Sequence, residues 1–440
     1  MNKDAVAEMS QQYQIETAQQ LVPEGYKQTE VGVIPEDWEV KSLGTLVDIR
    51  SGESPSKFTF QSAGIPYFKV EQLNNDSVYA DETPYFIENV KFIPAGSVIF
   101  PKRGASILLN KIRVLKKNSF MDTNLMTLTC HEQLDEIYLY NQLTYKGLDS
   151  VADTTSIPQI NNKHIIPYLI PFPTKEEQFV IANALSDTDA LLSELEKLIA
   201  KKQAIKTATM QQLLTGRTRL PQFAHHPDGS KKGYKQSELG EIPEDWEVEA
   251  LGENCHTYSG GTPSTSNSSF YGGNINWITS SDLNRSLIFE VRGRITELGL
   301  EKSAAKMIQP GTFLIALYGA TAGVCAISKI SAAINQAVLA VIPKKHSSKY
   351  LYYWFNKNKD EIIDTYTQGG QPNLSGNIIR SVKLPIPLAD EQTAIATILS
   401  DMDEEIQALE QRLNKTRQIK QGMMQELLTG KTRLVASQSR

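Results

Sequence analysis

Apolar residues recur at alternating steps of four and three positions in two segments of the chain, 181–213 and 395–427. This spacing puts them on one face of an α-helix in a heptad-like stripe, and it predicts two helices of about 33 residues, or ~50 Å, each. Acidic residues crowd the first turns and lysines follow, as the helix dipole favours. Gly216 and Gly430 stand where a left-handed C-terminal cap is expected, and Pro221 prevents continuation of the first helix.

The two helical segments are copies of each other. Residues 176–220 align without gaps on residues 390–434, with 22 of 45 positions identical. A helix with one apolar face cannot bury that face alone, and this chain supplies two such helices. We therefore expect the helices to pack on each other, antiparallel, because a long intervening segment brings the chain back.

The segments before the helices, about 45–172 and 253–386, also correspond in patches. "KFIPAGSVIFPKRGA" and "KMIQPGTFLIALYGA" each show a turn, an apolar β-type run and a glycine. "IPYFKVEQLNN" and "INWITSSDLNR" keep their apolar positions, whereas their polar positions differ. The pattern predicts one mixed α/β fold with many short strands, used twice with different polar residues.

Each of these segments opens with the same stretch, at 25–44 and at 233–252, where 15 of 20 positions are identical. Its carboxylates and tryptophan resemble an active site, and Lys41 after PEDWEV would even fit a nuclease. The second copy, however, has Glu249 in place of that lysine. We interpret both copies as the start of a domain, in which the tryptophan packs and the carboxylates face water or a partner.

Length and composition set limits on this picture. A chain of 440 residues favours two or more globular units. The net charge of −5 argues against a chain that coats nucleic acid by charge alone. The polar N-terminus shows no secretory signal, no run is apolar enough to span a membrane, and the three cysteines form no CxxC pair. We therefore expect a cytoplasmic protein with no metal site.

Motifs of catalysis are missing from the sequence. It contains no GxxxxGK[ST] phosphate loop, no GxGxxG after a strand and no Asn-Pro-Pro-aromatic segment, and HEQLD lacks the second histidine of a zinc-protease helix. The glycine pairs 260–261 and 272–273 are more typical of turns. We predict no catalytic residue in this chain.

The sequence gives stronger signals for nucleic-acid binding than for catalysis. A cluster of lysines and arginines lies between residues 102 and 117, and the second middle segment is rich in Thr, Ser, Asn and Gln, which hydrogen-bond base edges and phosphates. The same residues are ordinary in solvent-exposed loops. The candidate DNA-binding residues are Ser56, Lys57, Lys69, Gln72, Lys102, Arg103, Lys111, Arg113, Thr262, Ser264, Thr279, Ser281, Asp282, Arg285, Tyr318, Gln371 and Asn373.

Three segments resemble the specificity (S) subunit of Type I restriction–modification systems. They are SGGTPSTSNSSFYGGNINWITSSDL (259–283), GGQPNLSGNIIRSVKLPIPLADEQ (369–392) and IPQINNKHIIPYLIPFPTKEEQ (157–178). The helical segments LSDTDALL…QQLLTGRTRL and LSDMDEEI…QELLTGKTRL are also similar to helical regions of that family. The resemblance covers nearly the whole chain beyond residue 24. It departs in the junction before Glu-Gln, which reads Phe-Pro-Thr-Lys and Ile-Pro-Leu-Ala rather than a double proline.

The resemblance implies an α/β (α+β) fold with two globular target-recognition domains, two long antiparallel helices and an internal pseudo-two-fold repeat. The implied ranges are an N-terminal extension (1–24), target-recognition domain 1 (25–172), spacer helix 1 (173–220), target-recognition domain 2 (221–386), and spacer helix 2 with the C-terminal tail (387–440).

The resemblance also implies the function and the partners. Each domain would read one half of a bipartite, asymmetric site in double-stranded DNA, without catalysis. The helices would set the spacing and dock two methyltransferase (M) subunits, and two restriction (R) subunits would complete the complex. S-adenosylmethionine, ATP and Mg²⁺ would belong to those partners. The stripe residues assigned to spacing and docking are Leu185, Leu192, Leu195, Ile199, Leu399, Ile406, Leu409 and Leu413.

Helix geometry and composition give two further expectations. A rod of ~50 Å would separate two readers by about 10–15 base pairs. The acidic chain should bind DNA weakly by itself, because phosphate neutralisation supplies most non-specific affinity. The rival classes are an oligomerising coiled-coil adaptor, which leaves the changed polar faces unexplained, and a tandem ligand-binding module, which leaves the long helices unexplained.

Overall fold

The computed structural model describes residues 22–75, 77–88, 92–153, 157–366 and 373–434. The chain divides into two compact units: unit 1 comprises residues 1–197 and 410–440, and unit 2 comprises residues 198–409. Each unit therefore contains one domain, the beginning of one long helix and the end of the other. This grouping differs from the ranges given above, in which the helices stand as segments of their own.

Unit 1 is built on a five-stranded sheet in the order β4-β11-β8-β9-β6. Its strands pair antiparallel, except that β6 runs parallel to β9. They are β4 (Val47–Ser51), β6 (Tyr79–Ala80), β8 (Val98–Pro101), β9 (Arg113–Leu115) and β11 (Leu125–Cys130). Beside it lies a three-stranded sheet in the order β10-β5-β7, formed by β5 (Ile65–Phe68), β7 (Phe86–Ile87) and β10 (Phe120–Met121).

Two small ribbons, three short helices and parts of the two long helices complete the described part of unit 1. The hairpin of β1 (Tyr26–Thr29) and β2 (Gly32–Pro35) opens it, and β3 (Glu39–Ser42) pairs with β12 (Leu169–Phe172). The short helices are α2 (Ala105–Leu108), α3 (Glu136–Lys146) and α4 (Asn162–Ile165), and α5 (Lys175–Leu213) is the first long helix.

Unit 2 repeats this topology. Its five-stranded sheet has the order β16-β24-β21-β22-β18, which matches unit 1 strand for strand. The members are β16 (Cys255–Ser259), β18 (Leu287–Ile288), β21 (Phe313–Ala316), β22 (Cys325–Ser328) and β24 (Val338–Pro343). The prediction of one fold used twice is confirmed.

The second sheet of unit 2 has the order β19-β17-β23-β20. Its strands are β17 (Tyr271–Ile278), β19 (Arg294–Ile295), β20 (Lys306–Ile308) and β23 (Ala332–Ile334). The ribbons are β13 (Tyr234–Ser237) with β14 (Gly240–Pro243), and β15 (Glu247–Ala250) with β25 (Lys383–Ile386). The helices are α6 (Leu251–Asn254), α7 (Glu297–Glu301), α8 (Ser348–Lys357), α9 (Lys359–Tyr366), α10 (Gly376–Ser381) and the long α11 (Ala389–Leu427).

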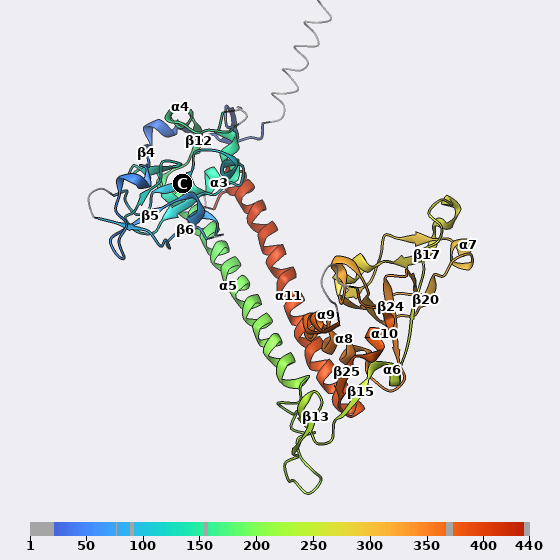
Figure 1. The fold of residues 1–440 in the computed structure, drawn as a ribbon. Coiled ribbons are helices and arrows are strands. Elements are labelled where there is room, and N and C mark those ends of the chain that lie inside the picture. Colours follow the sequence, from blue (N-terminus) through green and yellow to red (C-terminus); the bar gives the residue numbers. More distant parts are fainter. Residues whose placement is uncertain (1–21, 76, 89–91, 154–156, 367–372, 435–440) are drawn as a thin grey trace, which may run out of the picture. The chain divides into compact units, whose positions relative to one another are not determined.

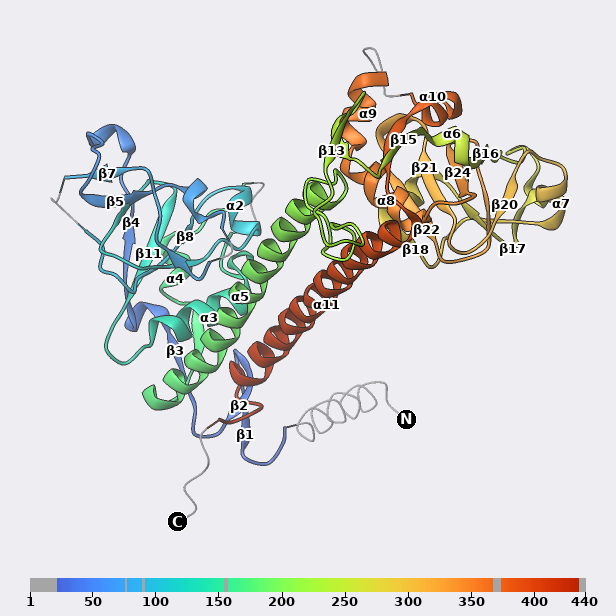
Figure 2. The same cartoon turned by 90° about the horizontal axis from the view of Figure 1, so that it is seen from below.

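The long helices α5 and α11 lie side by side and antiparallel in both views (Figures 1 and 2). Within unit 1, Lys420 of α11 binds Asp189 of α5 at 2.5 Å, and within unit 2, Lys206 of α5 binds Asp403 of α11. The positions where the sequence stripe turns polar are thus filled by cross-helix ion pairs. The antiparallel pairing is confirmed, but each helix has 39 residues rather than about 33.

The cores explain why the helices divide between the units. In unit 1, Ile181 and Leu185 of α5 pack with Leu427 of α11 into the core of the domain. In unit 2, Leu213 of α5 and Leu399 of α11 do the same. The apolar stripe of each long helix is therefore buried in the core of unit 1 at one end and in the core of unit 2 at the other. Among the described residues, no helix combines the length and the hydropathy of a membrane span.

Candidate nucleic-acid interface

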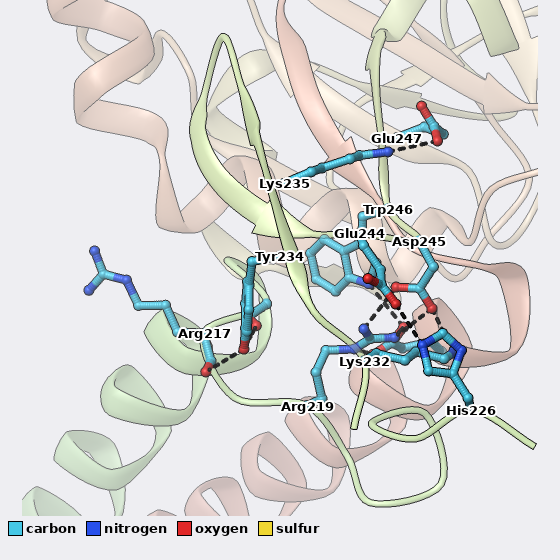
Figure 3. A network of polar contacts seen from close by, with 12 residues as sticks. Arg217, Arg219, His226, Lys232, Tyr234, Lys235, Glu244, Asp245, Trp246 and Glu247 are labelled. Atoms are coloured by element: carbon cyan, nitrogen blue, oxygen red, sulfur yellow. Dashed lines mark hydrogen bonds and ion pairs between the residues drawn. The ribbon is translucent and has the colours of Figure 1, made fainter. Parts of the chain in front are cut away.

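The duplicated opening stretch forms a polar cluster at the end of a long helix, which we call junction 2 in unit 2 (Figure 3). It consists of Arg219, Asp245, Trp246 and Glu391. Arg219 donates to both carboxylates, with Nη1–Oδ1 of Asp245 at 2.8 Å and Nη2–Oε2 of Glu391 at 2.7 Å. The indole Nε1 of Trp246 donates to the same Glu391 oxygen at 3.0 Å. Every charge of this cluster has a partner.

Unit 1 contains the same arrangement, junction 1, made of Arg433, Asp37, Trp38 and Glu177. Arg433 donates to Asp37 at 2.9 Å and to Glu177 at 2.8 Å, and Trp38 donates to Glu177 at 3.0 Å. The two tryptophans have exposed fractions of 1% or less, which confirms that they pack. Most carboxylates of the opening stretch face water as expected, with Glu39 and Glu247 side chains 65% and 72% exposed. One aspartate in each copy, Asp37 or Asp245, also pairs with an arginine beyond the end of a long helix. The junctions are structural and hold no free acid or base.

Charge pairing shows in the pKa values of the junction carboxyls. Burial raises the pKa of Asp245, but hydrogen bonds from Arg219 and Lys232 outweigh it and hold that pKa below its ordinary value. Hydrogen bonding to Arg433 likewise lowers the pKa of Asp37. Both carboxyls therefore carry a negative charge at neutral pH.

Glycines cap the helices at the junctions, as the sequence predicted. Gly216 and Gly430 have φ angles of +69° and +72°. A Cβ at Gly216 would stand 2.4 Å from Pro243, and one at Gly430 would stand 2.5 Å from Pro35. Only glycine therefore allows the opening stretch to approach the helix end.

The candidate DNA-binding residues fall into two groups in each unit. The first group lies on loops at the ends of the central strands. Lys102 and Arg103 follow β8, and Tyr318 follows β21. Ser56, Lys57, Thr262 and Ser264 lie on the loops after β4 and β16, and Asn373 lies opposite Tyr318 in an isolated β-bridge. Gln371 lies outside the described residues.

The second group lies at two 3₁₀ turns, Val70–Leu73 and Ser280–Arg285. Here several polar side chains serve the backbone. Gln72 accepts from the backbone NH of Lys69 at 3.0 Å, and Asp282 accepts from that of Thr279 at 2.8 Å. Each bond is the returning half of a capping box, in which the third side chain of the turn accepts from the backbone NH at its start, so the side chains fix the turn.

Other candidates, at these turns and at the start of β9, are also engaged within the protein. Arg113 has an exposed fraction of 9% and donates to Asn75 at 3.2 Å. Lys69 lies 3.5 Å from the ring centroid of Tyr85, and Lys111 binds Asn74. Arg285 donates to the carbonyl of Glu290 at 3.2 Å, and Ser281 lies 3.0 Å from the hydroxyl of Thr279. Arg113 is thus enclosed in the domain, whereas Arg103 and Asn373 of the first group are exposed.

The stripe residues assigned to spacing and docking are buried or half-buried. Leu185 and Leu399 are fully buried, and Leu195, Ile199, Ile406 and Leu413 are 8% exposed or less. Leu192 and Leu409 are half-buried. Because these side chains are buried or half-buried, a partner would contact the exposed faces of the helices instead.

Sequence reasoning missed the arginine–glutamate pairs of the junctions and the polar residues Gln159 and Gln336. The signal for the pairs was present, because TGRTRL and TGKTRL recur together with EEQ and DEQ. In each copy the glutamate binds the arginine and the tryptophan, while Gln178 or Gln392 accepts from the backbone NH that precedes α3 or α8, at 2.9 Å in both units.

Comparison with protein families identifies what this architecture is. The model of the Type I restriction modification DNA specificity domain matches the chain twice, at residues 35–207 and 243–420. The chain belongs to this family. Each match begins at the opening stretch and ends in a long helix, so the family unit is the repeat described above.

Curated relatives of the whole chain and of half of it are specificity subunits of type I restriction enzymes. The putative type I restriction enzyme MjaX specificity subunit of Methanocaldococcus jannaschii is 26% identical over 436 residues, which cover 93% of this chain and 97% of the relative. The EcoR124I/EcoR124II specificity subunit of Escherichia coli is 28% identical over 221 residues, covering 49% of this chain and 52% of the relative.

Solved structures share the fold. The S subunit of a Type I restriction–modification system from M. genitalium superposes with a TM-score of 0.56 at 18% identity, covering 89% of this chain and 96% of that one. A chain from a study of complex assembly and conformational transition in the type I R-M system gives a TM-score of 0.54, also at 18% identity, over 91% of this chain and 99% of its own length.

Proposed function

We propose that this chain is the non-catalytic DNA-specificity subunit of a Type I restriction–modification complex. The observation that carries the proposal is the repeat itself. One family domain occurs twice with the same strand order, and the exposed polar residues differ between the copies. Two scaffolds with different surfaces are what a reader of two different half-sites requires, so the full DNA site should be bipartite and asymmetric.

The long helices serve in this proposal as the spacer between the two half-sites. A continuous helix of 39 residues rises ~58 Å at ~1.5 Å per residue. Cross-helix ion pairs and buried leucines stiffen the pair in each unit. A change in helix length should therefore change the number of unread base pairs between the half-sites.

Two methyltransferase subunits and, in the full complex, two restriction subunits are the proposed partners. The duplicated helices offer two equivalent outer faces, which suits two copies of one partner. S-adenosylmethionine, ATP and Mg²⁺ would act in those subunits, together with the catalytic residues. Because the chain carries a net charge of −5, we propose that the partners also supply much of the phosphate contact, and that the chain alone binds DNA weakly.

Sequencing of modified bases in the genome tests this function. In cells that carry the intact chain with its methyltransferase, one asymmetric bipartite motif should be modified at nearly all its occurrences. Disruption of this chain alone should abolish the modification, while restoration from a plasmid should return it. A bipartite motif that stays modified without the chain would refute the proposal.

The tandem ligand-binding module and the coiled-coil adaptor are the alternative classes. Neither fits a chain in which both copies match a DNA specificity domain. The same experiment separates them, because neither class predicts any change in DNA modification when the chain is lost.

A further inference from the structure

Two loops meet at the end of the central sheet in unit 1 and form what we call loop seam 1. It comprises residues 102–104, which follow β8, and residues 158–160, which precede α4. The backbone NH of Ile160 donates to the carbonyl of Lys102 at 3.0 Å, and that of Gly104 donates to Pro158 at 2.9 Å. Arg103 and Gln159 are the residues paired across the seam. Two hydrogen bonds therefore fix the relative position of these side chains.

Loop seam 2 in unit 2 has the same construction. It joins residues 317–318, after β21, to residues 373–374, before α10. The backbone NH of Leu374 donates to the carbonyl of Leu317 at 2.7 Å, and Tyr318 is paired with Asn373. Ile160 and Leu374 both have an exposed fraction of 0%, so each seam is anchored in its core.

A third segment supports each seam from the other side. The backbone NH of Lys102 donates to Asn124 in unit 1, and that of Leu317 donates to Ala337 in unit 2, both at 2.8 Å. In unit 2 this segment also carries Gln336, whose carbonyl accepts from the Tyr318 hydroxyl and whose side chain binds Thr262 at 2.6 Å. The two seams thus share the same hydrogen-bonded backbone construction, which occurs once in each unit.

The side chains displayed on this scaffold differ in chemistry. Seam 1 presents the exposed guanidinium of Arg103 and the carboxamide of Gln159. Seam 2 presents Tyr318, which is 37% exposed, and the exposed carboxamide of Asn373. At the 3₁₀ turns, by contrast, Gln72 and Asp282 perform the same capping task in both units. Two different half-sites require different side chains on the same backbone construction, and the two seams meet this requirement.

We propose that the two loop seams are the base-reading edges of the domains, with Arg103 and Gln159 reading one half-site and Tyr318 and Asn373 reading the other. This inference rests on the proposed function and names the residues that carry it out. Arg103 offers the fork of donors that pairs with O6 and N7 of guanine, and Asn373 offers the carboxamide that pairs with N6 and N7 of adenine. We assign a guanine to the half-site of unit 1 and an adenine to that of unit 2.

Lysine and aspartate substitutions separate base reading from other roles. Arg103→Lys keeps the charge that a phosphate contact needs but loses the fork. Asn373→Asp keeps the shape but loses the amide donor. Arg103→Ala removes both the charge and the fork. Lys117→Ala is its charge-matched control in unit 1, because Lys117 is 66% exposed and pairs with Asp81 away from the seam. Each variant is assembled with its methyltransferase subunit, and its modified bases are mapped genome-wide.

The expected result is a loss of discrimination confined to one position in one half-site. Arg103→Lys should accept other bases in place of one guanine, with discrimination reduced by about tenfold or more. Asn373→Asp should do the same at one adenine in the opposite half-site. Lys117→Ala should keep the motif of the wild-type complex.

Other results overturn the inference. An unchanged motif in Arg103→Lys and Asn373→Asp would show that the seams do not read bases, while the wild-type motif would leave the proposed function intact. A uniform loss of modification in Arg103→Ala that Arg103→Lys restores would make Arg103 a phosphate contact. A wild-type complex that modifies no bipartite motif would remove the proposed function and this inference together.

Discussion

Arg433, near the end of the chain, binds Glu177 at the first turn of α5, with Nη2 of the arginine 2.8 Å from Oε2 of the glutamate. The pair joins residues 256 positions apart in sequence. Its counterpart, Arg219 with Glu391, joins the end of α5 to the first turn of α11. Each unit is therefore closed by an ion pair between the end of one long helix and the beginning of the other.

Removal of Arg219 should destabilise unit 2 strongly. Its side chain is 6% exposed and Glu391 is 2% exposed, so Arg219→Ala leaves a buried carboxylate without its main partner. The loss of a partner from a buried pair costs about 3–5 kcal/mol. Thermal unfolding followed by calorimetry should show a lower transition for unit 2, with Arg217→Ala, an exposed neighbour, as the control.

Arg433→Ala is the matched variant in unit 1. The Arg433 side chain is 33% exposed, so water can approach Glu177 once the arginine is gone, and the loss of stability should be smaller than in Arg219→Ala. Equal stability of Arg219→Ala and Arg217→Ala would contradict the structural role of the junctions.

The contribution of Asp245 should depend on pH in one direction. Its pKa is lower in the folded chain than the ordinary value of 3.8, so the stability it provides is present above that value and is lost as pH falls through the lower folded pKa. The destabilisation by Asp245→Asn should be constant from about pH 8 to about pH 5 and should shrink below about pH 4. Denaturant titrations of both proteins across this range measure it; a difference that grows on acidification would contradict the assignment.

Buried leucines of the stripe should support the two units separately. Leu185→Ala and Leu399→Ala each remove a fully buried side chain, which costs about 2–5 kcal/mol. Leu185 belongs to the core of unit 1 and Leu399 to that of unit 2. Hydrogen exchange should therefore show lost protection mainly in the unit that holds the variant. Leu191→Ala, 41% exposed on α5, is the control and should change little.

Longer helices should widen the gap in the DNA site. A heptad inserted after Lys201 in α5 and another after Ile406 in α11 keep the apolar stripe in phase and preserve the Lys206–Asp403 and Lys420–Asp189 pairs. The ~10 Å added corresponds to about three base pairs. Sequencing of modified bases should show both half-sites unchanged and the gap longer; an unchanged gap would show that the helices are not the spacer. The insertion in α5 alone should instead disrupt the pairing and reduce stability.

The sequence predicts the parts of this protein that depend on local pattern. Heptad spacing predicts the paired helices, and the glycines before RTRL and KTRL predict their C-terminal caps, because helical periodicity and left-handed backbone are local properties. The capping box of Thr279 and Asp282 could also have been read from the sequence, because Thr-x-x-Asp is a capping pattern.

The parts that depend on long-range contact could not be predicted in this way. Arg219 and Glu391 each look like an ordinary charge at a helix end, and only the fold brings them together. The same holds for the loop seams, since Arg103 and Gln159 come from segments far apart in sequence. The burial of Arg113 also depends on the fold, because its position in a basic cluster of the sequence does not indicate that the side chain is enclosed.

The central claim is that one duplicated scaffold carries two independent readers. The most direct test of this claim is the exchange of one domain. Residues 253–386 are replaced by the corresponding segment of a family member with a different target, and the modified bases of the genome are sequenced. The account predicts a new motif in which one half-site has changed, while the other half-site and the gap are retained. A motif altered in both halves would contradict it.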